Sequence, residues 1–89
     1  MVARRFLVSG RVQGVGYRYF ASRAGSAMRL DGWVRNLPDG RVEAYATGVA
    51  RDLDTFAERL REGPAAGHVR SVEVLEEVVD VRIEGFHIR

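Results

Sequence analysis

A glycine-rich stretch near the start of the chain, SGRVQGVGYRYF, carries the residue types with the clearest chemical potential. Gly14 and Gly16 permit backbone conformations that other residues resist, and a loop of this kind can turn several N–H groups toward one point. Arg18 follows where a helix is expected to begin. Free N–H donors, the positive end of a helix and a guanidinium together favour a phosphate or a carboxylate.

The position of Arg18 is informative because a cation at a helix N-terminus is unfavourable beside the helix dipole. An anion bound next to it would remove that cost, and a planar guanidinium matches two oxygens of such an anion. The alternative interpretation is a tight turn followed by a solvent-facing arginine. The glycine spacing of a dinucleotide-binding loop is not met, so the stretch alone does not decide between the two.

A second polar candidate is Asn36, in the stretch GWVRNLPDG. An asparagine just before Pro38 is commonly a turn residue that bonds its own backbone. The strand end that carries Asn36 is, however, expected to lie near the glycine-rich loop. A neutral amide has both a donor and an acceptor, so Asn36 could hold a water molecule against a bound phosphoryl group.

Hydrophobic periodicity predicts the elements that position these residues. Residues 3–12 alternate as a strand, with Phe6, Val8, Gly10 and Val12 on one face. The remaining expected elements are a helix over 18–30, a hairpin through Trp33, Val34 and Val42 to Ala46 with its turn at Pro38–Gly40, a helix over 51–62, a strand over 68–79 and a short strand over 86–89. Gly25 is unfavourable inside a helix, and a close approach of helix to sheet would explain it.

This order predicts an α+β protein with a ferredoxin-like βαββαβ sandwich, in which two helices cover one face of an antiparallel sheet and a short C-terminal strand is added. The 89 residues suffice for one core, so we expect a single domain over residues 1–89. Tyr17, Tyr19 and Phe20 are expected to anchor the first helix in that core.

Composition narrows the function further. The net charge of +2, from 14 basic and 12 acidic residues, gives no support for nucleic-acid binding by bulk electrostatics. Cysteine and lysine are both absent, which excludes thiolate and Schiff-base chemistry. No apolar run approaches the roughly 18 residues of a membrane span, and no secretion signal is evident, so we expect a cytoplasmic protein that does not bind membranes.

Metal-ligand spacing is also lacking. His68 and His87 are 19 residues apart, and the first is expected in a loop and the second on an exposed strand. The acidic residues Glu76, Glu77 and Asp80 have the pattern of a solvated strand end. The sequence therefore predicts neither a metal nor a cofactor.

The stretches GRVQGVGYR and GWVRNLPDGRVEAYATG closely resemble the two signatures of the acylphosphatase family, and GPAAGHV and FHIR resemble its later segments. The resemblance spans nearly the whole chain. It implies a ferredoxin-like fold and hydrolysis of acyl phosphates to a carboxylate and inorganic phosphate, without a metal. The expected partners are these small molecules alone, and the expected state is a monomer.

The resemblance also implies roles for individual residues. The family's phosphate-binding arginine falls on Arg18 and its water-orienting asparagine on Asn36. Its phosphate-cradling loop falls on Gln13, Gly14, Val15, Gly16 and Tyr17. Two positions depart from the family pattern: Arg29 stands where glycine is common and would strain a left-handed helix cap, and Thr47 stands where glutamate is common.

Two other functions use the same order of elements. An RNA-recognition module would need aromatic residues on the open face of the first and third strands. The only aromatic residue that the sequence offers there is Tyr45, and the other residues of that face are Arg5, Leu7, Ser9, Arg11, Arg41, Glu43 and Thr47. A catalytically silent phosphate-binding module would retain the loop without turnover. The resemblance favours the enzyme over both.

Overall fold

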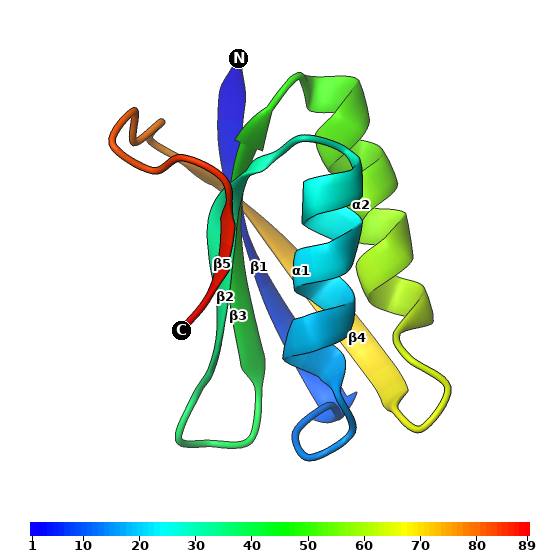
Figure 1. Cartoon of the computed structure of the whole chain (residues 1–89). Helices are drawn as coiled ribbons and strands as arrows, with labels where there is room; N and C mark the ends of the chain where they lie inside the picture. The colour runs from blue at the N-terminus through cyan, green and yellow to red at the C-terminus, as the bar shows by residue number, and fades with distance from the viewer.

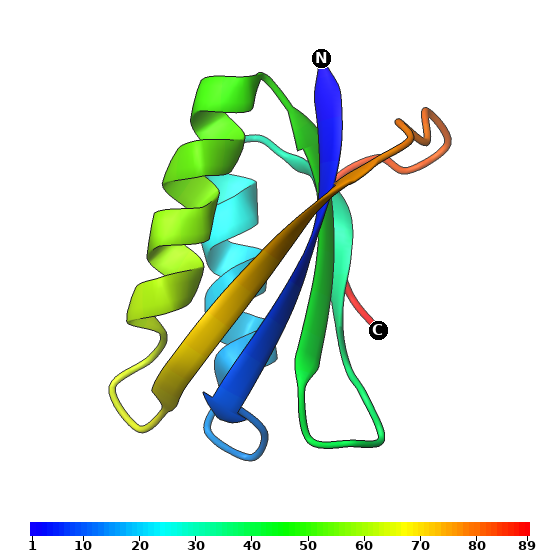
Figure 2. The same cartoon turned by 180° about the vertical axis from the view of Figure 1, so that it is seen from behind.

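A computed structural model describes residues 1–89 as seven elements (Figure 1). They are β1 (Val2–Arg11), α1 (Tyr17–Ala27), β2 (Asp31–Asn36), β3 (Val42–Gly48), α2 (Ala50–Glu62), β4 (His68–Glu77) and β5 (Phe86–Ile88). The strands form one sheet in the order β4-β1-β3-β2-β5. Both helices lie on the same side of this sheet, as the views from front and back show (Figures 1 and 2).

The predicted ferredoxin-like order and the short C-terminal strand are confirmed, but the sheet is not wholly antiparallel. The first four strands pair antiparallel, whereas β5 runs parallel to β2, so the complete sheet is mixed. The edge of the sheet is thereby extended by a short strand that places the last residues of the chain beside β2. His68 is the first residue of β4, so the expectation that it lies in a loop is wrong.

The core lies between the sheet and the helices and contains 15 buried residues. Phe6 and Val8 of β1 point into it, and the ring of Phe6 packs edge-on against Phe56 of α2, with centroids 5.3 Å apart. The helical spacing that predicted α2 is matched by its buried residues, Leu53, Phe56, Ala57 and Leu60. Burial of this stripe fixes α2 against the sheet.

Two details near β1 and α1 differ from the predictions. Gly10 does not join the buried face of β1, because the pairing of β1 with β4 shifts between Ser9 and Gly10 and leaves Gly10 exposed at the irregularity. Helix α1 ends at Ala27 instead of residue 30, since Arg29 has a left-handed φ of 57°. Arg29 is the only residue other than glycine with a positive φ. This agrees with the expectation that an arginine where the family commonly has glycine would strain a left-handed helix cap.

The N-terminal aromatic residues of α1 have different surroundings. Tyr17 is buried and its hydroxyl donates a 2.7 Å hydrogen bond to the main-chain oxygen of Leu60, which fastens α1 to α2. This burial raises the pKa of Tyr17 well above its ordinary value. Phe20 packs at the border of the core, but Tyr19 is 60 % exposed, so its expected role as a core anchor is wrong.

The sheet face opposite the helices carries a stacked aromatic pair, Trp33 and Tyr45, with ring centroids 5.8 Å apart. The Tyr45 hydroxyl donates to the main-chain oxygen of Val78 and accepts from the N–H of Asp80, so the loop after β4 covers part of this face. Arg89 lies over the other ring, 4.6 Å from the centroid of Trp33. The rings of Trp33 and Tyr45 therefore already make contacts within the protein.

Carboxylates on the same face pair with the arginines of neighbouring strands. Glu43 is buried and accepts hydrogen bonds from Arg5 and Arg35, while Glu77 accepts a further one from Arg5. The hydrogen bond that Arg5 donates to Glu43 is the main cause of the raised pKa of Arg5. Neither helix has the length and apolar character that crossing a membrane would take.

Candidate active site

The glycine-rich loop and the turn between β2 and β3 lie at the same end of the molecule, the lower end in Figure 1. The loop joins β1 to α1 over residues 12–16, and the turn spans residues 37–41. Strand β5 ends beside β2 and brings Ile88 toward this region, since Ile88 pairs with Val34. Three chain segments that are far apart in the sequence therefore meet here.

The loop owes its course to two glycines with left-handed φ values, 75° at Gly14 and 79° at Gly16. A Cβ atom at either position would meet nothing within 4 Å, so the demand for glycine arises from the backbone conformation and the space beside it is open. Gly16 is the N-cap of α1, and the first turn of that helix contains no acidic residue. The unpaired N–H groups of this turn therefore face no carboxylate of their own helix.

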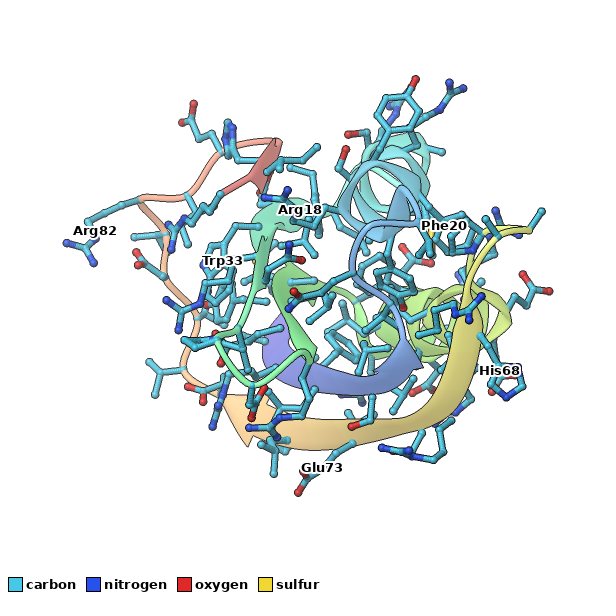
Figure 3. The ribbon with its side chains drawn as sticks, turned by 90° about the horizontal axis from the view of Figure 1, so that it is seen from below. Arg18, Phe20, Trp33, His68, Glu73 and Arg82 are labelled. Atoms are coloured by element: carbon cyan, nitrogen blue, oxygen red, sulfur yellow. The ribbon has the colours of Figure 1, made fainter.

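Arg18 is half-buried in the first turn of α1. Its Nη1 donates a 2.9 Å hydrogen bond to the main-chain oxygen of Arg89. The N–H of Arg89 in turn donates to the main-chain oxygen of Val34 in β2. Figure 3, seen from this end of the molecule, shows Arg18 between α1 and the last strand. The end of the chain thus orients a guanidinium that nothing on α1 neutralises.

The side chain of Gln13 is directed toward the turn between β2 and β3. Its Nε2 donates to the main-chain oxygen of Leu37 at 2.8 Å and to that of Arg41 at 3.0 Å. The side chain therefore ties the glycine-rich loop to the turn that follows Asn36. Only the main chain of Gln13 remains available to a bound anion.

The turn itself is held by its own hydrogen bonds. Leu37 donates to the oxygen of Arg41, and Gly40 donates to the oxygen of Leu37. Asp39 accepts from the N–H of Arg41, and this bond, together with the Arg41 guanidinium, lowers the pKa of Asp39. None of these bonds uses the amide of Asn36, which is exposed at the end of β2.

A cavity of about 230 Å³ lies between these segments. It is lined by Val12, Gly14, Gly16, Tyr17, Arg18, Tyr19, Asn36 and Ile88. A single water needs only about 10–15 Å³ of such space, so the cavity has room for a small anion together with water. The cavity brings Arg18 and Asn36 together with the two glycines, whereas Val15 faces a separate groove between the helices.

The arrangement suits an anion bound at the start of α1 with an amide at its side. The N–H groups of the first turn and Arg18 supply positive potential. No group of three or more His, Cys, Asp and Glu side chains is placed to hold a metal ion. The family profile described as Acylphosphatase matches residues 4–88.

The chain belongs to the acylphosphatase family. Curated acylphosphatases confirm this along almost the full length. The one from Archaeoglobus fulgidus is 43 % identical over 88 residues, covering 99 % of this chain and 98 % of that protein. The one from Thermus thermophilus is 45 % identical over 82 residues and 92 % of each chain.

Solved structures agree with the acylphosphatase fold. The crystal structure of the Bacillus subtilis acylphosphatase is 38 % identical, has a TM-score of 0.95 and covers 100 % of this chain and 99 % of that one. A region of HypF from T. kodakarensis is also similar, at 30 % identity and a TM-score of 0.86, but this chain spans only 12 % of that much larger protein.

The sequence did not indicate every residue around the acylphosphatase cavity. Ile88 lines it, and the main chain of Arg89 accepts the hydrogen bond from Arg18. The stretch FHIR predicts a short strand, but its parallel pairing with β2 depends on contacts across the whole sheet. Periodicity could therefore not place these two residues beside Arg18.

Proposed function

We propose that this acylphosphatase holds the phosphoryl group of an acyl phosphate in a phosphate cradle, defined here as residues 13–18. In this proposal the N–H groups of the loop and the guanidinium of Arg18 bind the phosphoryl oxygens, and Asn36 orients the attacking water. One observation carries it: a single cavity is lined by the two left-handed glycines, Arg18 and Asn36.

Hydrolysis of an acyl phosphate requires few further groups in the site. A carboxylate is already a good leaving group, so the protein needs to bind the phosphoryl oxygens, offset their charge and place a water in line. Arginine stays protonated and asparagine does not titrate, so neither residue acts as a general base. The proton of the water passes to the substrate itself. No residue in this scheme requires a metal ion.

Gln13 has a supporting role in the proposal. Its two hydrogen bonds span the gap between the cradle and the 37–41 turn. This fixes the position of Asn36 relative to the phosphoryl group. Gln13 is therefore a positioning residue, because its side chain acts through Asn36 and does not contact the substrate.

The main alternative is a phosphate-binding module without turnover, since similar regions exist within larger proteins such as HypF. The cavity geometry supports phosphate binding in both cases. Asn36 favours the enzyme, because a module that only binds phosphate has no use for an amide placed to hold water. A single domain over residues 1–89, a monomeric state and a cytoplasmic location stay predictions from the sequence.

The direct test is phosphate release from acetyl phosphate and benzoyl phosphate by the purified protein, with and without a chelator. We expect hydrolysis well above the spontaneous rate and the same rate with EDTA. Tight phosphate binding without hydrolysis of either compound would favour the silent module. Loss of activity on chelation, restored by added metal, would contradict the metal-free mechanism.

A further inference from the structure

The largest hollow of the molecule is not the cavity at the phosphate cradle but an open groove of about 660 Å³ between α1 and α2. We call it the interhelical groove. Six of its 11 lining residues are hydrophobic. On α1 and at its C-cap they include Phe20, Ala24, Ala27 and Met28, which recur at helical spacing along one side of the helix. The groove therefore offers an apolar strip that follows α1 over most of its length.

The groove begins where the phosphate cradle ends. Gly16 and Tyr19 line both hollows. Gly16 has no side chain, and a Cβ atom there would meet nothing within 4 Å, so no side chain at position 16 separates the two hollows. Tyr19 stands beside it with 60 % of its surface exposed. A chain attached to a phosphoryl group in the cradle can thus continue into the groove.

Two arginines at the groove, Arg23 and Arg59, already make contacts with neighbouring side chains. Arg23 lies 5.6 Å from the centroid of the Tyr19 ring, and its Nη1 donates to the Tyr19 hydroxyl at 3.1 Å. Arg59 lies 5.2 Å from the centroid of the Phe20 ring and pairs with Glu62 at 2.7 Å. The charge of Arg59 is balanced by Glu62, and Arg23 is turned toward the Tyr19 ring, so both side chains present hydrocarbon stems beside aromatic surface. Together with the six hydrophobic lining residues, this favours an apolar occupant.

We propose that the interhelical groove binds the acyl chain of the substrate and selects elongated, apolar acyl phosphates over short ones. The inference rests on the proposed function, because it places the phosphoryl group in the cradle. At about 1.5 Å per residue along α1, Arg23 lies about 10 Å and Ala27 about 16 Å beyond Gly16. A four-carbon chain therefore contacts only the first turn of α1, whereas an extended ten-carbon chain, about 11 Å long, reaches the level of Arg23, toward which a longer side chain at position 27 would point back.

Binding tests this without requiring turnover. The probes are butylphosphonate and decylphosphonate, the latter used below its micelle concentration, measured by calorimetry. Complete burial of one methylene corresponds to about fourfold in affinity, and an open groove to about half of that factor. We expect decylphosphonate to bind at least about tenfold more tightly than butylphosphonate. Equal affinities of the wild-type protein for the two probes would overturn the proposal.

The matched variants are Ala27→Glu, which places a carboxylate in the groove, and Ser26→Glu, which adds the same charge one residue away. Both residues are exposed, and only Ala27 lines the groove. Ala27→Glu should abolish the advantage of decylphosphonate, and Ser26→Glu should preserve it. An advantage that persists in Ala27→Glu would place the alkyl chain elsewhere.

Measurements of kcat/KM separate the proposal on the interhelical groove from the proposed function. The ratio of kcat/KM for decanoyl phosphate to that for butyryl phosphate should exceed one in the wild-type protein and fall in Ala27→Glu. Hydrolysis of both substrates with a ratio unaffected by Ala27→Glu would reject the groove and leave the proposed function intact. No hydrolysis of either, with decylphosphonate binding that still depends on Ala27, would reject the enzyme and retain the groove.

Discussion

The side-chain amide of Gln13 donates a 2.8 Å hydrogen bond to the main-chain oxygen of Leu37, the residue that follows Asn36. The same nitrogen also donates to Arg41 at the other side of the turn. One side chain thereby joins the glycine-rich loop to the hairpin that carries the second catalytic candidate. We therefore predict that this contact matters for turnover, because a misplacement of about 1 Å can cost on the order of 100-fold in rate.

Replacing Gln13 by alanine should lower kcat about tenfold, because the turn and Asn36 lose their fixed position relative to the cradle. Inhibition by inorganic phosphate should change little, since the main chain of the loop remains. A purely structural role is distinguished by a double-mutant cycle. In an Asn36→Ala background, Gln13→Ala should cause no further loss of kcat. Independent, multiplicative losses would show that Gln13 does not act through Asn36.

Asn36→Ala should lower kcat by about 100-fold or more while KM and phosphate inhibition stay near the wild-type values. This is the pattern of an interaction that is made mainly in the transition state. Asn36→Asp should not restore kcat, since a carboxylate beside a bound phosphate repels it. Full kcat with a lower melting temperature would instead show that Asn36 only shapes the turn.

Gly25→Ala should destabilise the protein, although alanine is favoured over glycine in a helix by about 1 kcal/mol. A Cβ atom at Gly25 would clash with the ring of Phe86, and overpacking of this kind costs about 1–3 kcal/mol. The comparison is made by denaturant unfolding. In a Phe86→Ala background the same change should be neutral or stabilising. An increase in stability in the wild-type background would contradict the packing described here.

Arg29→Gly should stabilise the protein by about 0.5–1 kcal/mol. A left-handed conformation costs a residue with a side chain about 1–2 kcal/mol, and the greater freedom of glycine in the unfolded chain offsets part of this gain. In a domain of this size that corresponds to a melting temperature higher by about 2–8 °C. Arg29→Ala serves as the control and should bring no such gain. A lower melting temperature for Arg29→Gly would show that its side chain contributes more than the strain costs.

The order of the elements was predictable because their hydrophobic patterns are regular. The buried positions of α2 and the alternation of Phe6 and Val8 in β1 are local properties of the sequence. The exposure of Gly10 and the early end of α1 were not predicted, since a strand irregularity and a left-handed residue interrupt a pattern that otherwise continues. The close approach expected at Gly25 was correct, but Phe86 could not be named as its cause.

The candidate site was predictable to a similar extent. Arg18, Asn36 and the two glycines could be chosen from residue type, position and family resemblance, and the fold places them around one cavity. The sequence could not show that the side chain of Gln13 is directed to the neighbouring turn. It also could not show that Tyr19 stands between two hollows, because both features depend on how distant segments meet.

The most direct test of the proposed mechanism is the affinity for inorganic phosphate of Arg18→Ala, measured by calorimetry beside its kcat and melting temperature. Loss of a charged hydrogen bond to a bound anion corresponds to about 2–5 kcal/mol. We predict phosphate binding weaker by at least about 30-fold and nearly abolished turnover, in a protein that still unfolds cooperatively. A folded Arg18→Ala variant that binds phosphate as tightly as the wild-type protein would contradict the central role of Arg18.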